Sequence, residues 1–277
     1  MKILFSKLFA AAVWLMLLPA YAQDADGEWQ LPREHSSLIG GSVTAATIDA
    51  NGNLYAGGRF TGAAGISVNR VARWNETQQR WEPLGSGVNP DVNAVTTDAA
   101  GHLYAGGTFT RAGEQEVNYV ARWNINTERW EALGSGFDAR VYAMTSDING
   151  NVYAAGLFSF AGDFRRLNRV ARWDDVSERW EPLGNGLSAN IRALATDTEG
   201  NVYAAGDITG VARWNIDSQT WETLGSLSLR GLTELAIDAA GNVYAGGFVS
   251  DGNSGTVRRW DVSTCLLYTS PSPRDRG

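Results

Sequence analysis

Carboxylates are the most plentiful reactive side chains in this chain of 277 residues, which has 30 Asp and Glu but two His and a single Cys. Zinc sites and nucleophilic triads need His or Cys ligands and bases, and His35 and His102 lie far apart in the sequence. Paired carboxylates would suit sugar hydrolysis, yet no spacing singles out a pair. The residues therefore favour a binding protein over an enzyme.

Two acidic segments imitate the start of a calcium loop, Asp49-Asn51-Asn53 and Asp147-Asn149-Asn151. A calcium loop needs a Glu at its twelfth position, where this chain has Phe60 or Phe158. Turn formation explains both segments, so we expect no metal and no cofactor.

The charge of the chain restricts its partners. Residues 23–264 hold 19 Arg, no Lys and 29 Asp plus Glu, a formal charge of −10. Nucleic acids and anionic lipids bind basic surfaces, so neither is an expected partner. This part also has no Cys for a disulfide, and packing alone must stabilise it.

Both ends differ from the rest of the chain. Residues 1–22 combine Lys2 and Lys7, an apolar run and Ala20-Tyr21-Ala22, which predicts a bacterial signal peptide and export to the periplasm or the extracellular space. No later stretch is long enough to span a bilayer. Residues 265–277, CLLYTSPSPRDRG, resemble a translated sequencing adapter, so we expect a non-native tail after a domain at 23–264.

Between these ends the motif VARWNxxxxxWExLG recurs. Its first Trp returns every 41 to 50 residues, at Trp74, Trp123, Trp173, Trp214 and Trp260. In the type unit, residues 92–134, four short strand patterns are separated by Gly-rich and polar turns. A repeat of this length with four strands predicts an all-β propeller of four-stranded antiparallel blades.

The repeat also predicts the number and packing of the blades. About five are present, the last lacking its fourth strand, and GEWQLP at 27–32 could close the ring; a native ring of six or seven blades stays open. The two Trp columns are expected to pack blade against blade. The Arg before each first Trp forms a complete column, which indicates a structural ion pair or ring stacking.

The double glycines (Gly57-Gly58, Gly106-Gly107, Gly246-Gly247) and the Trp74-Asn75 pair resemble the kelch family, including the galactose oxidase propeller. That resemblance implies a copper held by two His and two Tyr, one cross-linked to Cys, whereas residues 23–264 have two distant His and no Cys, so we do not expect this site. A nearer resemblance is to bacterial LYxGGxFTxAGG…ARW repeats, also found in a fungal cortical polarity marker.

Function is expected where the repeat varies. In a meander, the loops from second to third strand and those between blades share one face. Aromatic and Arg side chains are frequent in binding hot spots, and the residues peculiar to single blades there are Asp91, Arg111, Glu114, Glu116, Tyr119, Arg140, Phe160, Phe164, Arg165, Arg166, Arg192 and Arg230. The fourth blade, with only Thr209-Gly210 in this loop, is expected to leave a cleft.

These residues predict an exported binding or scaffold module for a protein or a glycan. Two alternatives stay open. One is a carbohydrate-active hydrolase or lyase with carboxylate catalysis, its site partly in a missing C-terminal region. The other is a repeat segment of a cell-surface adhesion protein.

Overall fold

The computed structural model describes residues 38–63, 65–224, 229–249, 255–261 and 266–269. The predicted signal peptide and the GEWQLP segment lie outside these residues. Within them, no helix is long and apolar enough to cross a membrane.

Five four-stranded antiparallel sheets make up the fold, which confirms the predicted propeller of meander blades. Blades 1 and 2 consist of β2 (Val43–Ile48), β3 (Leu54–Gly58), β6 (Val71–Asn75), β7 (Arg80–Pro83), and of β9 (Val92–Thr97), β10 (Leu103–Gly107), β13 (Val120–Asn124), β14 (Arg129–Ala132). Blades 3 and 4 consist of β15 (Val141–Ser146), β16 (Val152–Gly156), β17 (Val170–Asp174), β18 (Arg179–Pro182), and of β19 (Ile191–Thr196), β20 (Val202–Gly206), β21 (Val211–Asn215), β22 (Thr220–Leu224). Blade 5 consists of β23 (Leu229–Ile237), β24 (Val243–Val249), β25 (Gly255–Asp261), β26 (Leu266–Thr269).

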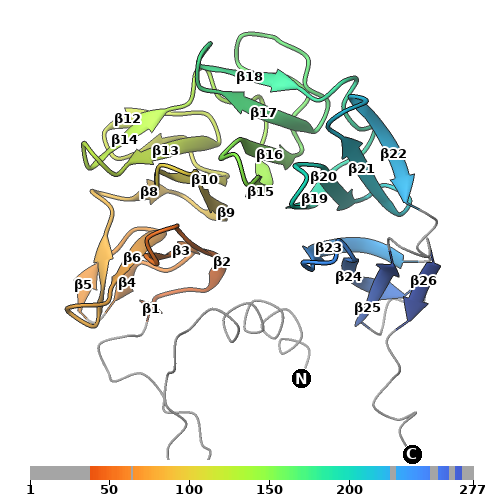
Figure 1. Cartoon of the computed structure of the whole chain (residues 1–277). Helices are drawn as coiled ribbons and strands as arrows, with labels where there is room; N and C mark the ends of the chain where they lie inside the picture. The colour runs from red at the N-terminus through yellow and green to blue at the C-terminus, as the bar shows by residue number, and fades with distance from the viewer. Residues whose placement is uncertain (1–37, 64, 225–228, 250–254, 262–265, 270–277) are drawn as a thin grey trace, which may run out of the picture.

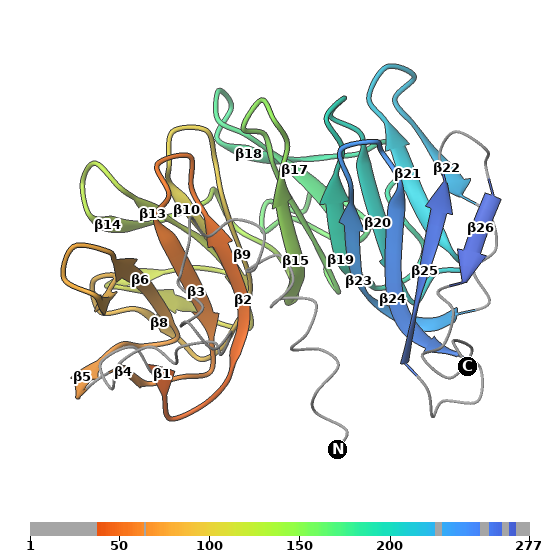
Figure 2. The same cartoon turned by 60° about the horizontal axis from the view of Figure 1, so that its bottom comes forward.

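The blades stand side by side in an arc, with the first strand of each on the inside (Figure 1). Successive first strands are neighbours, β2 to β9, β9 to β15, β15 to β19 and β19 to β23. The view in Figure 2 shows blades 1 and 5 at the two ends of this arc.

The fifth blade differs from expectation. We predicted that its fourth strand is missing, but β26 occupies that position and pairs with β25 from Arg258↔Thr269 to Asp261↔Leu266. Residues of the predicted non-native tail therefore form the outer strand of blade 5. Backbone pairing of this kind makes few demands on side-chain identity, since the hydrogen bonds join main-chain groups.

An Asp-centred turn joins the first and second strands of every blade. In blade 3, Asp147 Oδ1 accepts hydrogen bonds from the backbone N–H groups of Asn149 and Asn151, both at 2.9 Å, and its Oδ2 accepts from the Tyr153 hydroxyl at 3.0 Å. Gly150 completes the turn with a φ of 83°. The carboxylate thus satisfies the turn and holds the Tyr of the next strand, which explains the calcium-like spacing.

The second glycine of each pair is required by close backbone approach. The first strand of each of the first four blades carries a bulge next to this glycine. A Cβ on Gly107 would lie 2.0 Å from the Asp91 carbonyl oxygen, whereas one on Gly106 would meet only side chains, the nearest being Val141 Cγ1 at 2.5 Å. This difference explains why the first glycine is replaced by Ala155 and Ala205.

The two Trp columns form cross-strand pairs that pack between blades, as predicted. Trp123 and Trp130 are direct partners on β13 and β14, with ring centroids 5.5 Å apart. The Trp130 indole N–H donates to Leu84 O of the preceding blade at 2.9 Å. Trp221 donates to Leu183 O of the preceding blade in the same way.

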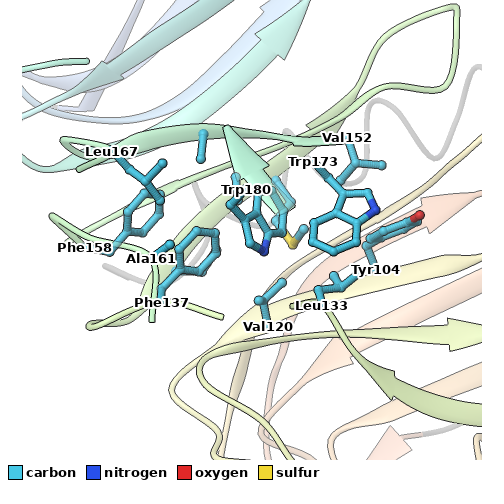
Figure 3. Close-up of a cluster of buried hydrophobic side chains, with 14 of the residues drawn as sticks. Tyr104, Val120, Leu133, Phe137, Val152, Phe158, Ala161, Leu167, Trp173 and Trp180 are labelled. Atoms are coloured by element: carbon cyan, nitrogen blue, oxygen red, sulfur yellow. The ribbon is translucent and has the colours of Figure 1, made fainter. Parts of the chain in front are cut away.

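Blade 3 packs on blade 2 through a larger aromatic cluster (Figure 3). Phe137 stacks on Phe158 with centroids 4.1 Å apart and lies 4.7 Å from the Trp180 ring. Trp180 is buried, but its indole N–H has no hydrogen-bond partner within the part of the chain that the structure describes. Phe137 stands where the connections beside Trp130 and Trp221 have Val88 and Leu187, so the residue packed next to Trp180 is larger than at those two positions.

Candidate functional site

The two faces of the arc differ in charge. The turn face consists of the turns from first to second strand (49–53, 98–102, 147–151, 197–201, 238–242) and from third to fourth strand (76–79, 125–128, 175–178, 216–219). These turns contain no Arg or Lys, and their acidic residues are Asp49, Glu76, Asp98, Glu128, Asp147, Asp175, Glu178, Asp197, Glu199, Asp217 and Asp238. The negative charge of the chain is therefore concentrated on this face.

The loop face consists of the loops from second to third strand and of the connections between blades. Over blades 1 to 4 it balances basic residues (Arg59, Arg70, Arg111, Arg140, Arg165, Arg166, Arg169) against acidic ones (Asp91, Glu114, Glu116, Asp138, Asp163, Asp207). An anionic partner is repelled less by this face than by the turn face.

The long loops of the loop face are ordered hairpins rather than irregular loops. In blade 1, β4 (Gly62–Ala63) pairs with β5 (Ile66–Ser67) and with β1 (Leu38–Ile39). In blade 2, β11 (Arg111–Ala112) pairs in the same way with β12 (Gln115–Glu116) and β8 (Val88–Asn89). Blade 3 repeats the arrangement as isolated bridges, Phe137↔Ala161 and Phe160↔Arg166.

Each hairpin is anchored by buried side chains that recur. They are a Phe, an Ala and an aliphatic residue in each blade: Phe60, Ala63, Val68; Phe109, Ala112, Val117; Phe158, Ala161, Leu167. The outward-facing residues do not recur. A constant scaffold with variable outward side chains is the arrangement of a binding surface.

In blade 2 the outward residues are charged. Arg111 and Glu116 are direct cross-strand partners, and Arg111 lies 3.9 Å from Glu114 in an exposed ion pair. Tyr119 ends this hairpin with a φ of 67°, the conformation that Arg70 and Arg169 adopt in their blades. The structure thus brings together Arg111, Glu114 and Glu116, whereas Tyr119 packs against the hydrophobic cluster between blades 2 and 3.

In blade 3 the outward residues are aromatic and basic. Phe164 is 88 % exposed and Phe160 38 % exposed. Phe164 lies in the left-handed region at φ 65°, and its N–H donates to Ala161 O at 2.9 Å. Arg165 reaches both oxygens of Glu181 on β18, at 2.5 and 2.6 Å, and Arg166 Nε donates to Asn168. A non-Gly residue in this region is strained, so the hairpin holds Phe164 outward in a fixed conformation.

Three predicted residues lie where the first strands begin, at the inner edge of the loop face. Asp91 forms ion pairs with Arg59 at 3.2 Å and Arg70 at 3.7 Å. Arg140 is exposed. Arg192 pairs with Asp207, with Nε 3.0 Å from Oδ1, which raises the Arg192 pKa and lowers the Asp207 pKa through this hydrogen bond.

Sequence reasoning missed the partners of Arg192. Its guanidinium carbon lies 5.4 Å from the centre of the Tyr142 ring, and Asn190 donates to Asp207 at 3.0 Å. Tyr142 and Arg192 occupy the bulge positions of β15 and β19. At the same positions of blades 1 and 2, Thr44 and Asn93 donate hydrogen bonds to the carbonyl oxygens of Val92 and Val141 in the next blade. That break in the repeat at 142 and 192 was visible in the sequence.

Two further expectations concern the Arg230 side chain and the cleft expected at blade 4. The Arg230 side chain and most of the loop at 250–256 lie outside the described residues. At the short loop of blade 4, Ile208 packs against the core of that blade. A hollow of about 430 Å³ lies elsewhere, on the outer edge of blade 2, lined by Gln115, Thr127, Arg129, Trp130, Glu131 and Ala132.

The Arg column has the structural role that was predicted in three blades. Arg73 pairs with Glu82 at 3.1 Å, Arg122 with Glu131 at 2.9 Å, and Arg213 with Glu222 at 3.8 Å. Among the described residues, no three His, Cys, Asp or Glu side chains are grouped as a metal site.

Two solved structures share the fold. One is the extracellular domain of the putative one component system BT4673 from B. thetaiotaomicron, with a TM-score of 0.58 and 14 % identity, and the other is the extracellular domain of the putative hybrid two component system BT4673, with a TM-score of 0.57 and 14 % identity. Each match covers 84 % of this chain and 28 % of the other, so this chain spans little more than a quarter of their length. At this identity the likeness concerns the fold alone. No curated protein matches the chain.

The family comparison is more specific. Residues 83–236, which run from blade 1 into blade 5, match the model of the Rax2 C-terminal beta propeller domain. This match supports a propeller, whereas the resemblance to kelch repeats and galactose oxidase stays a prediction. The chain belongs to the Rax2 C-terminal beta propeller domain family.

Proposed function

We propose that this protein is an exported binding or scaffold module that recognises a protein or a glycan through its loop face. The observation that carries this proposal is the hairpin of blade 3, which holds Phe164 88 % exposed on a rigid base. A large aromatic side chain in water is unfavourable for the isolated molecule, and aromatic and Arg residues dominate binding hot spots. Phe160 and Arg166 stand beside it on paired strands.

Export rests on two observations. The first is the signal-peptide pattern of residues 1–22. The second is that the two solved structures with this fold are described as extracellular domains.

The carbohydrate-active enzyme receives less support from the site. Its catalysis needs two carboxylates that flank a sugar bond, one of them free to hold a proton. At the inner edge of the loop face, the hydrogen bond from Arg192 lowers the pKa of Asp207, which leaves this carboxylate unsuited to act as an acid. Asp91 is held in ion pairs with Arg59 and Arg70.

The test uses an exposed apolar residue on the other face as its control. Val176 is 95 % exposed on the turn from third to fourth strand of blade 3. The protein, Phe164→Ala and Val176→Ala would be screened on a glycan array and on a panel of cell-surface proteins. We expect a ligand whose affinity falls at least about tenfold in Phe164→Ala and is unchanged in Val176→Ala. A ligand that binds all three equally, or no ligand on either panel, would contradict the proposal.

A further inference from the structure

Two side chains at the inner edge of the loop face depart from the role that the repeat gives to their position. The second residue of the first strand lies at the bulge in each of the first four blades. In blades 1 and 2 this residue is small and polar, and it fastens the next blade: Thr44 donates to Val92 O at 2.6 Å, and Asn93 donates to Val141 O at 2.8 Å. Tyr142 and Arg192 form no such bond among the described residues, so these two side chains are available for another role.

Tyr142 and Arg192 belong to a cluster of four side chains. The Arg192 guanidinium donates two bonds to Asp207, from Nε to Oδ1 at 3.0 Å and from Nη2 to Oδ2 at 3.2 Å. Asn190 donates to the same carboxylate at 3.0 Å, and the Tyr142 ring centre lies 5.4 Å from the guanidinium carbon. A bidentate ion pair fixes the plane of the guanidinium, so the cluster holds its polar groups in a set orientation.

The cluster is open to solvent because the loop of blade 4 is short. Residues 207–210 alone connect β20 to β21, where blades 1 to 3 have a hairpin. In blades 1 and 3 the residue before the third strand is Arg70 or Arg169, whose guanidinium donates to the carbonyl of Phe60 or Leu157 at the end of the second strand. Blade 4 has Gly210 at this position. The side chains of Arg192 and Asp207 are accordingly 38 % and 35 % exposed.

The chemistry of the cluster matches the hydroxyl groups of a sugar. Within the described part of the chain, Arg192 Nη1, Asn190 Oδ1 and the Tyr142 hydroxyl have no hydrogen-bond partner, which leaves both donors and acceptors for a ligand. A sugar hydroxyl both donates and accepts, so it can use such a mixed set.

The charges of the cluster favour a neutral ligand. The charge of Arg192 is balanced by Asp207, and the exposed Arg140 is balanced by the exposed Asp138 in the connection before β15. An anionic ligand would meet the Asp207 carboxylate beside the guanidinium that attracts it.

We propose that Tyr142, Asn190, Arg192 and Asp207 form a binding site for a neutral sugar residue of a glycan. The inference rests on the proposed function, because it takes the glycan as the ligand of the loop face and assigns it a site at the inner edge of that face. The bonds within the cluster orient the polar groups before the sugar arrives, which reduces the entropy lost on binding.

The repeat itself supplies variants that preserve the fold. Tyr142→Asn and Arg192→Asn introduce the residue that blade 2 has at this position, Asn93. Thr44→Asn makes the same replacement in blade 1 and is the matched control. The full chain and each variant would be screened on an array of neutral and uronic-acid-containing oligosaccharides. The neutral oligosaccharide that binds the wild type most tightly would then be titrated calorimetrically into each protein.

We expect the wild type and Thr44→Asn to bind this oligosaccharide equally, and Tyr142→Asn and Arg192→Asn to bind it at least about tenfold more weakly. Asp207→Asn keeps the shape of the cluster but removes the charge that balances Arg192. It should therefore shift the preference toward uronic-acid-containing oligosaccharides, a change that partial unfolding would not produce.

Three outcomes would overturn the inference. Equal binding by the wild type, Tyr142→Asn and Arg192→Asn would do so, and so would a wild type that prefers uronic acids. A protein ligand that Phe164→Ala loses, with no neutral oligosaccharide bound, would overturn the sugar site and leave the proposed function in place. The absence of any ligand on the glycan and protein panels would overturn both.

Discussion

Arg165 of the blade 3 hairpin forms an ion pair with Glu181 of the outer strand β18, with Nη1 2.5 Å from Oε1 and 2.6 Å from Oε2. In blades 1, 2 and 4, the Glu at the position of Glu181 instead forms an ion pair with the Arg of the third strand, as Glu131 does with Arg122. In blade 3, therefore, Glu181, which recurs in the other blades, binds Arg165, which does not recur. The ion pair connects the variable hairpin to the scaffold and lies one residue from Phe164.

Arg165→Ala should release the hairpin of blade 3 without unfolding the blade. Both side chains are about a third exposed, so the expected loss of unfolding free energy is only about 0.5–1 kcal/mol. The larger effect should be local, with faster hydrogen exchange at the Phe164 amide, which donates to Ala161 O. Arg111→Ala, which removes a long and exposed ion pair with Glu114, is the control and should change neither quantity. Equal effects of the two substitutions would show that the Glu181 contact does not hold the hairpin.

The blades were predictable because the same sequence motifs recur from blade to blade. The double glycine, the Asp-centred turn and the two Trp columns each have a contact in the structure that requires them, and each appears in several copies. The fourth strand of blade 5 was not predictable. Residues 266–269 carry none of the repeat's side chains, and their place depends on main-chain pairing with β25, which leaves no pattern in a sequence.

The candidate site was predictable in part. The position of Phe160, Phe164, Arg165 and Arg166 on one loop followed from the chain order. The ion pairs of Arg165 with Glu181 and of Asp91 with Arg59 did not follow from the sequence, because the partners are distant along the chain and a Glu recurs at the Glu181 position in the other blades. Pairs formed across a fold are visible only when the register of the strands is known.

Trp130 and Trp180 occupy equivalent positions but differ in one hydrogen bond, which allows a matched comparison. Trp130→Phe removes the bond to Leu84 O, which keeps only its hydrogen bond from the Gly87 N–H at 3.1 Å, whereas the Trp180 indole N–H has no bond to lose among the described residues. Both substitutions reduce buried area by a similar amount. We therefore expect Trp130→Phe to lower the free energy of unfolding by about 1 kcal/mol more than Trp180→Phe. Urea unfolding of the two variants measures the difference, and a larger loss for Trp180→Phe would show that its N–H is bonded in solution.

The adjacent glycines 106 and 107 should respond differently to the same substitution. Gly106→Ala brings a Cβ against the Val141 and Met144 side chains, which can shift, and Ala is the native residue in blades 3 and 4; a loss of about 1 kcal/mol is expected. Gly107→Ala places the Cβ 2.0 Å from a backbone oxygen, so the bulge of β9 must rearrange, with a loss of more than about 3 kcal/mol. Thermal and urea unfolding compare the two. Similar losses for the two variants would mean that the backbone at Asp91 shifts as easily as the Val141 and Met144 side chains.

The buried tyrosines of the Asp-centred turns should make the protein sensitive to alkali. Burial, and then the charge of Asp49, raise the pKa of Tyr55 to about 12, and burial likewise raises the pKa values of Tyr104, Tyr153 and Tyr203. Because the folded pKa lies above the unfolded value near 10, the stabilisation is complete below pH 10 and is lost as the pH rises toward 12. Over that range the unfolded chain binds fewer protons than the folded one, so each such tyrosine lowers the free energy of unfolding by about 1.4 kcal/mol per pH unit. Urea unfolding at pH 7, 9, 10.5 and 11.5 should show this fall. Tyr55→Phe should reduce its slope by the share of one tyrosine while changing stability at pH 7 little, since the Tyr55 hydroxyl lies 3.4 Å from Asp49. A slope that is the same with and without Tyr55 would mean that water reaches this turn before the blade unfolds.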